Sequence, residues 1–320
     1  MKKKRKLKKK AVIVLVLILF IIIFGSMTIT NKIKEYNYHK TIEYKLLNLG
    51  YSKEEINILK EKTNSNFMNS LLEIERDENY FSIINDAYYI KDNLDDYIAY
   101  YESHLNTKPD KVVTKVNIHA TKDWYEEIKE TDTSKDTLII NNKYYKLSKD
   151  YVPEDLIDVS NWYSYGKQKL SKRAYEPFLE MFNKAKEEDI TLIINSGYRS
   201  YDYQEELYNS YIKRNGQKET DNYAARAGHS EHQTGLAMDL TTYGYNADNF
   251  HESKAYSWLQ DHAHEYGFIM RYPKDKEDIT GYKYESWHYR YVGVEVATFI
   301  HTYDITYDEY YAYYIEHNMK

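Results

Sequence analysis

The chain has 320 residues, and none of them is cysteine. Disulfide bonds and metal sites built from thiolates are therefore excluded, and so is a lipid anchor attached through cysteine. A chain without thiols is compatible with an exported protein, because such a protein then needs no thiol–disulfide chemistry outside the cell.

Glycine and proline are scarce, with 11 and 4 residues, and they are unevenly distributed. Residues 31–150 contain one glycine and one proline. So few helix breakers over this length favour helices, and Ser52 with Glu55 forms the sequence pattern of a capping box. We expect residues 31–130 to form a mostly helical spacer or accessory region.

Basic and apolar residues are segregated at the N-terminus. Residues 1–10 contain eight Lys or Arg and no acidic residue, and residues 11–30 form a predominantly apolar run. A helix of about 20 apolar residues spans a bilayer, and a basic flank stays in the cytoplasm. A cleaved signal peptide is the alternative. The length of the run and the lack of a small-residue cleavage site favour a retained transmembrane signal-anchor, with the rest of a single-pass protein outside the cell membrane.

The remainder of the chain is acidic. Residues 11–320 hold 36 basic and 50 acidic residues, a net charge of −14. Binding to nucleic acid requires a positively charged face to meet the phosphates. We therefore exclude nucleic acid as a partner.

The second half of the chain mixes helical and strand patterns without regular alternation. Apolar residues at helical spacing mark 175–182, 203–211 and 255–262, and strand-like runs occupy 138–140, 191–194, 236–240 and 282–292. This mixture predicts the α+β class, with a small antiparallel sheet flanked by helices, for a domain of residues 131–320.

Two short motifs contain side chains that bind metals. The motif Ser-Glu-His-Gln-Thr-Gly-Leu-Ala-Met-Asp includes His232 and ends at Asp239, and the motif Glu-Ser-Trp-His runs from Glu285 to His288. Two imidazoles and a carboxylate suit a borderline cation such as zinc. A catalytic zinc site has three protein ligands and an open position, and a further carboxylate is suited to proton transfer.

The spacing of these residues makes two structural demands. His232 and Asp239 are seven residues apart, so on one strand they would point to opposite faces. Gly235 allows a turn that leaves His232 in a loop and Asp239 on a strand. Glu285 and His288 are three residues apart and need a bulge or bend if both face one metal ion.

The pattern S-x-H-x-x-G-x-A-x-D followed by E-x-W-H resembles the VanY-type D-alanyl-D-alanine carboxypeptidases, a family of zinc metallopeptidases. The resemblance covers roughly residues 135–305. It includes Ser-Gly-Tyr-Arg-Ser-Tyr at 196–201 and Trp-His-Tyr-Arg-Tyr-Val-Gly at 287–293. This family is expected to adopt the α+β fold predicted above.

The resemblance also implies roles for individual residues. His232, Asp239 and His288 are the expected ligands of one zinc ion per chain, and Glu285 is the expected general base and acid. Arg199 is expected to face the carbonyl or the terminal carboxylate of the substrate, which a guanidinium group suits.

Gln204 and Ser230 are weaker candidates for hydrogen bonds to the substrate, and Ser230 is equally suited to bracing the His232 loop. Ser286 stands where the family usually has proline, which puts the rigidity of the bend before His288 in doubt.

The implied function is that of a membrane-anchored zinc D,D-carboxypeptidase, which removes the C-terminal D-alanine from peptidoglycan stem peptides or their precursors. An L,D-carboxypeptidase that trims tetrapeptide stems would use the same motifs. A non-catalytic wall-binding protein is a further alternative, although it would need no base at Glu285.

Overall fold

The computed structural model describes residues 2–319, which form two compact units. Unit 1 comprises 1–98 and 108–110, and unit 2 comprises 99–107 and 111–320. Met1 and Lys320, the ends of the first and last predicted regions, lie outside the described residues. The predicted domain boundary after residue 130 would be a finer division within unit 2, and it stays a prediction.

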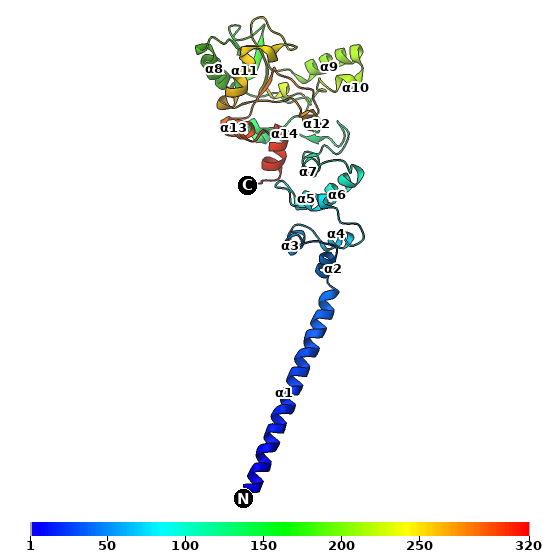
Figure 1. The fold of residues 1–320 in the computed structure, drawn as a ribbon. Coiled ribbons are helices and arrows are strands. Elements are labelled where there is room, and N and C mark those ends of the chain that lie inside the picture. The colour runs from blue at the N-terminus through cyan, green and yellow to red at the C-terminus, as the bar shows by residue number, and fades with distance from the viewer. Residues whose placement is uncertain (1, 320) are drawn as a thin grey trace. The chain divides into compact units, whose positions relative to one another are not determined.

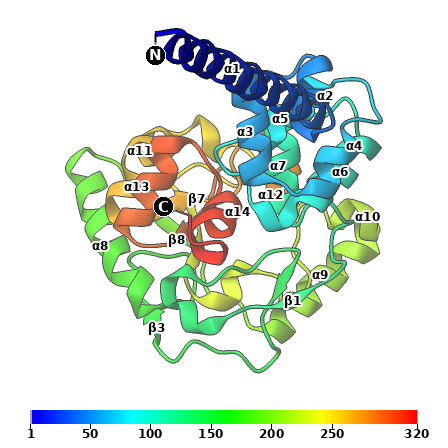
Figure 2. The same ribbon diagram turned by 90° about the horizontal axis from the view of Figure 1, so that it is seen from below.

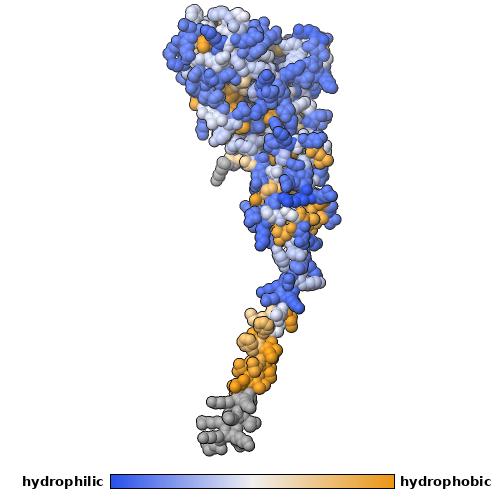
Figure 3. Space-filling model, viewed as in Figure 1, coloured by the Kyte–Doolittle hydropathy of each residue, from blue (hydrophilic) through white to orange (hydrophobic). Residues whose placement is uncertain are grey.

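Unit 1 begins with the long helix α1 (Lys2–His39). Its stretch from Val12 to His39 is the one segment of the described chain that is long and apolar enough to cross a membrane, and a signal sequence would have the same properties. The apolar side chains from Val12 onward are exposed along this helix, as Figure 3 shows. The predicted run at 11–30 is thus the apolar part of a longer helix.

The rest of unit 1 consists of short helices, as predicted from its few glycines and prolines (Figure 1). Ser52 and Glu55 form the predicted capping box at the start of α3, with each side chain accepting a hydrogen bond from the other residue's backbone N–H. Buried Ile56 and Leu59 lie on the inner face of this helix. The helices are α2 (Ile42–Asn48), α3 (Lys53–Lys62), α4 (Ser65–Ser70), α5 (Glu78–Ile84), η1 (Lys91–Asn93) and the start of α6 (Leu94–Ser103).

A four-stranded antiparallel sheet organises unit 2, with the strand order β5-β6-β8-β7. Its strands are β5 (Ile193–Ser196), β6 (Ala237–Thr241), β7 (Phe268–Met270) and β8 (His288–Tyr291). Two short pairs accompany it: β1 (Lys129–Glu130) with β2 (Tyr145–Lys146), and β3 (Leu156–Val159) with β4 (Gln168–Ser171).

Helices flank the sheet, so the predicted α+β class is confirmed. Figure 2 shows α13 beside β7, and residues of these two elements are in contact. The longer helices are α7 (Pro109–Asn117), α8 (Lys172–Glu187), α9 (Tyr201–Asn215), α11 (Lys254–His262) and α13 (Val294–Tyr303). The shorter ones are η2 (Thr133–Leu138), α10 (Gln217–Thr220), η3 (Glu231–Thr234), η4 (Phe250–Glu252), η5 (Ala263–Tyr266), α12 (Glu277–Thr280), α14 (Tyr307–Tyr310) and the π-helical η6 (Tyr311–Glu316).

Alternation along β6 separates the apolar core from the polar face of the sheet. Met238 and Leu240 are buried in one core cluster with Phe178 and Phe182 of α8. Each such buried side chain contributes about 1.5–3 kcal/mol. Ala237 and Asp239 point to the opposite face, where the polar residues discussed below are found.

One predicted strand is wrong, and another is wrong in part. Leu138 ends the 3-10 helix η2, and Ile139 follows it in no strand. The carbonyl of Ile139 accepts a hydrogen bond from the Arg290 side chain, at 2.6 Å, and therefore needs no strand partner. In the run predicted at 282–292, only His288–Tyr291 is a strand, because residues 282–287 form a loop and turn.

Candidate active site

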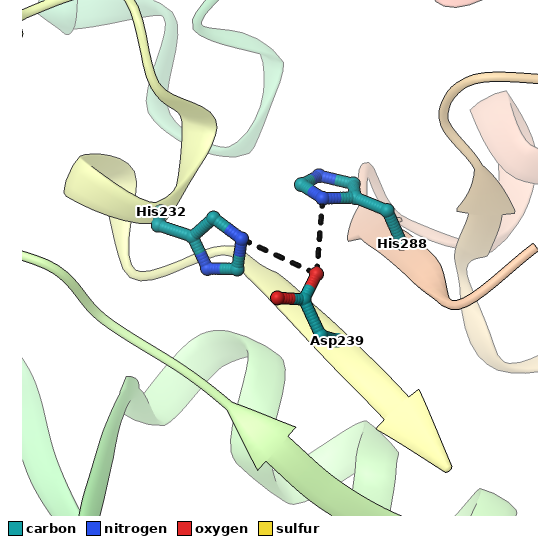
Figure 4. A group of neighbouring side chains, drawn as sticks. All are labelled: His232, Asp239 and His288. Atoms are coloured by element: carbon teal, nitrogen blue, oxygen red, sulfur yellow. Dashed lines mark ion pairs between the residues drawn. The ribbon is translucent and has the colours of Figure 1, made fainter. Parts of the chain in front are cut away.

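Three residues with metal-binding side chains meet on the polar face of the sheet (Figure 4). His232 lies in η3, and Gly235, with a φ of 69°, turns the chain into β6. Asp239 of β6 is paired in register with His288, the first residue of β8. The turn predicted between His232 and Asp239 is therefore present, and the loop and strand lie as expected.

The three side chains direct one ligand atom each toward a common point. Asp239 Oδ1 lies 3.3 Å from His232 Nε2 and 3.2 Å from His288 Nδ1, and the three atoms lie within 4.8 Å of one another. His232 Nδ1 is 2.7 Å from the carbonyl oxygen of Gly197. Because a carbonyl can only accept, Nδ1 carries the proton and Nε2 presents a lone pair.

The titratable side chains of this group have shifted pKa values: burial would lower the pKa of His288, but Asp239 and Glu231 raise it to about 9. Burial lowers the pKa of His232 to about 4, so its imidazole is neutral. Burial would raise the pKa of Asp239, but His232 and Arg199 hold it well below its usual range. Asp239 Oδ1 is buried without a hydrogen-bond partner. Ligands about 2.0–2.1 Å from a tetrahedral centre lie about 3.3 Å apart, which matches the two distances from Asp239.

Glu285 lies beside this group, in the turn before β8. The backbone N–H of His288 donates to the carbonyl of Glu285 at 3.3 Å, which provides the predicted bend. Glu285 Oε2 is then 3.6 Å from His288 Nδ1. Burial raises the pKa of Glu285 to about 8, and the Asp239 charge acts in the same direction. We call His232, Asp239, His288 and Glu285 the ligand cluster.

A cavity of about 690 Å³ opens over the ligand cluster and is lined by all four of its residues. Arg199 also lines it, where the chain leaves β5. Arg199 Nη2 donates to Asp239 Oδ2 at 2.6 Å, and Nε donates to Ser196 Oγ at 3.0 Å. The guanidinium group is thus held beside the cavity, next to the Asp239 carboxylate.

Gln204 and Ser230 line the same cavity. Gln204 Nε2 donates to the Ala225 carbonyl at 2.7 Å, while its Oε1 is buried without a hydrogen-bond partner. The carbonyl of Ser230 accepts from Asn141 Nδ2 at 2.7 Å, so the backbone of this residue braces the His232 loop. Gln204 therefore keeps one unpaired acceptor, enclosed next to the cavity.

A second group of charged residues was not predicted from the sequence. Glu231 Oε1 accepts from Arg271 Nε at 2.8 Å and from Arg290 Nη1 at 2.9 Å. Both oxygens of Asp308 accept from Arg271, at 2.6 and 3.1 Å. We call these four residues the ionic cluster. Burial would raise the pKa of Glu231, but Arg271 and Arg290 hold it well below its usual range.

Comparison with known proteins places the chain in a family. The VanY model, described as D-alanyl-D-alanine carboxypeptidase, matches residues 167–294. The putative carboxypeptidase YodJ of Bacillus subtilis is 38% identical over 204 residues, which cover 59% of this chain and 74% of that relative. The chain belongs to the VanY family. It is accordingly a peptide hydrolase of the carboxypeptidase kind.

Two further relatives of the VanY-family chain differ in their named activity. A D-alanyl-D-alanine carboxypeptidase of Enterococcus faecalis is 38% identical over 146 residues, covering 42% of this chain and 53% of that relative. The solved structure of the LD-carboxypeptidase LdcB superimposes with a TM-score of 0.55 and 37% identity, covering 59% of this chain and 91% of LdcB.

Proposed function

We propose that the protein is a membrane-anchored zinc D,D-carboxypeptidase that removes the C-terminal D-alanine from peptidoglycan stem peptides. The observation that carries this proposal is the convergence of His232 Nε2, Asp239 Oδ1 and His288 Nδ1 beside Glu285 in one cavity. Membership of the VanY family supports the choice of substrate.

The proposed metal ligands are His232, Asp239 and His288. Imidazole and carboxylate donors suit zinc, and the unpartnered Asp239 Oδ1 fits a bound cation. A zinc ion bound here would acidify a water molecule and polarise the scissile carbonyl group.

Glu285 is the proposed general base and acid. In its ionised form the Glu285 carboxylate takes a proton from the attacking water, and it then delivers a proton to the amine nitrogen as the C–N bond breaks. The products are the shortened peptide and free D-alanine, so all atoms of the added water are accounted for. The position of Glu285 Oε2, 3.6 Å from a ligand nitrogen, supports this role.

Arg199 and Gln204 are proposed to orient the substrate. A guanidinium fork at the cavity edge suits the terminal carboxylate or the carbonyl oxygen. The unpartnered Oε1 of Gln204 suits a substrate N–H. Ser230, which lines the cavity, completes the proposed substrate contacts.

The helix α1 is proposed to anchor the enzyme, with the catalytic domain outside the membrane. The basic residues before the apolar run support this orientation. Peptidoglycan precursors are assembled at that surface, so an anchored enzyme would lie close to its substrate.

An L,D-carboxypeptidase is the second candidate, because the structural relative with a TM-score of 0.55 is LdcB. Both activities cut one residue from a peptide C-terminus, and they differ in whether a pentapeptide or a tetrapeptide stem is shortened.

The deciding experiment is mass spectrometry of products from the full-length protein in detergent, loaded with zinc. Defined pentapeptide and tetrapeptide stems are supplied separately. Loss of D-alanine from the pentapeptide alone supports the D,D assignment. Loss from the tetrapeptide alone replaces it with the L,D assignment, and cleavage of neither stem contradicts both.

A further inference from the structure

Two buried polar atoms at the junction of the two clusters lack a hydrogen-bond partner. These are Glu231 Oε2 and His288 Nε2, and they lie 3.6 Å apart, within ion-pair distance. Glu231 and His288 are only 1% and 4% exposed, so neither atom forms a hydrogen bond with bulk water. Leaving both unpaired would be costly.

The orientation of His288 explains why these atoms face each other. Its Nδ1 is directed at Asp239 Oδ1, so Nε2 is the nitrogen on the far side of the ring. A metal-bound histidine usually donates its other N–H to a carboxylate or carbonyl, which fixes the ring orientation and raises its basicity. His232 already has such a partner in Gly197.

We propose that Glu231 is the positioning residue for His288, and that Asp308 holds Glu231 in place through Arg271. This inference rests on the proposed metal site. Glu231 Oε2 would accept a hydrogen bond from the N–H at His288 Nε2, leaving Nδ1 as the ligand atom.

The two arginines of the ionic cluster both bind the same oxygen of Glu231. Its Oε1 is shared by Arg271 and Arg290, so only Oε2 remains for His288. Arg271 is fully buried and is itself held by both oxygens of Asp308. Asn142 Nδ2 donates to Asp308 Oδ1 at 2.7 Å and fixes that carboxylate in turn.

The location of Asp308 gives this arrangement a wider consequence. Asp308 lies in α14, beyond residue 294, where the family match ends. The C-terminal segment would therefore support a metal ligand from beyond the residues that the VanY model matches.

The test compares zinc affinity of the full-length protein and its E231Q variant in detergent, by competition with a chromophoric chelator. We expect E231Q to bind zinc about 10- to 100-fold more weakly. Unchanged affinity would overturn the inference. If the unsubstituted protein binds no zinc, the proposed function itself fails, and the two failures are thus distinguished.

E231D is the second variant in case the uncharged side chain does not fold between two arginines. The E231D side chain keeps the negative charge that Arg271 and Arg290 bind. It is one methylene shorter, so its carboxylate would lie farther from His288. A folded E231D with weakened zinc binding supports the inference, and a folded E231D with full affinity contradicts it.

Asp308 is tested with a matched control on the same helix. Asp308 and Glu309 are both buried carboxylates of α14, but Glu309 Oε2 caps the helix by accepting from Thr306 N–H at 2.7 Å. We expect D308N to weaken zinc binding to a value between those of the parent and E231Q. E309Q should lower the melting temperature and leave zinc affinity unchanged. Equal losses of zinc affinity in D308N and E309Q would show that Asp308 contributes only to the stability of the fold.

Discussion

The ligand cluster and the ionic cluster occupy neighbouring positions on one face of the same sheet, yet their charges are arranged differently. In the ionic cluster each arginine lies between acceptors, and every guanidinium nitrogen of Arg271 and Arg290 donates a hydrogen bond. In the ligand cluster, lone pairs of Asp239 and His232 point at a shared space. The arginines of the ionic cluster therefore have their full set of partners, whereas the ligand cluster holds lone pairs that could bind a cation.

The pairing register of β6 and β8 places the two clusters side by side. Asp239 is opposite His288, and two residues away Ala237 is opposite Arg290. The small Ala237 leaves room for the large Arg290 side chain, while Asp239 supplies a ligand atom. The difference shows that burial of charge alone does not mark a functional site; the distinguishing feature is the convergence of three potential ligand atoms in one cavity.

The largest expected effect comes from removing the metal. Dialysis of the full-length protein against a chelator should abolish peptide cleavage, and added zinc should restore it. The fold should persist, because the sheet and the ionic cluster hold the ligands without metal. Cleavage assays and circular dichroism check this. Global unfolding on chelation would show that the ligand cluster is structural as well.

Glu285→Gln should lower kcat by about 10²- to 10⁴-fold, the usual contribution of general acid–base catalysis. Zinc content should stay at one ion per chain, because Glu285 is not a proposed ligand. Steady-state kinetics and metal analysis measure the two quantities. Undiminished turnover would remove Glu285 from the proposed mechanism.

Arg271→Met tests the ionic cluster by leaving Glu231 and Asp308 without their shared cation. The variant should lose about 3–5 kcal/mol of unfolding free energy, because breaking a buried pair leaves uncompensated charge. Denaturant unfolding measures the loss. Arg173→Met is the control: Arg173 pairs with Asp155 at a site 36% exposed, where a pair contributes about 0–1 kcal/mol. Similar losses in both variants would contradict the distinction.

The Ala237→Val variant tests whether the space between β6 and the Arg290 side chain is tightly packed. Ala237 is fully buried, and overpacking of such a site typically costs about 1–3 kcal/mol. We expect that loss in unfolding free energy with zinc stoichiometry retained. Full stability would show that the space opposite Arg290 is not tightly filled.

The smallest effect is expected for Asp155→Asn. Asp155 forms a partly exposed ion pair with Arg173, outside both clusters. Partial burial raises the pKa of Asp155, but hydrogen bonds from Arg173 and Ser171 lower it to about 2. The folded pKa is below the unfolded value of about 3.9, so the stabilisation is present above that pH and is lost as pH falls toward 2. The variant should be less stable by about 1 kcal/mol at pH 7, and this difference should shrink as pH falls through 2, as measured by unfolding at each pH.

Local patterns in the sequence sufficed for many elements. The apolar spacing at 175–182 predicted the helix α8, and the buried Phe178 and Phe182 lie on its inner face. Gly235 predicted the turn between His232 and Asp239, because glycine readily adopts the positive φ found there. The residues of the ligand cluster were named from two motifs, and their roles stay predictions.

The strand predicted at 138–140 failed for a reason that no local pattern contains. The carbonyl group of Ile139 is satisfied by Arg290, a residue about 150 positions away in the chain. The ionic cluster was missed in the same way, since a lone Arg271 or Asp308 resembles any surface charge until its partners are known.

The sequence by itself therefore predicted several helices and the turn at Gly235, because these depend on residues a few positions apart, and its two motifs named the candidate metal-binding side chains. Only the tertiary structure decided which charges are buried together, which of them compensate one another, and that Glu231 faces His288. Pairing across strands and between α14 and the sheet brings distant residues into contact, and the cost of burying a charge depends on those contacts alone.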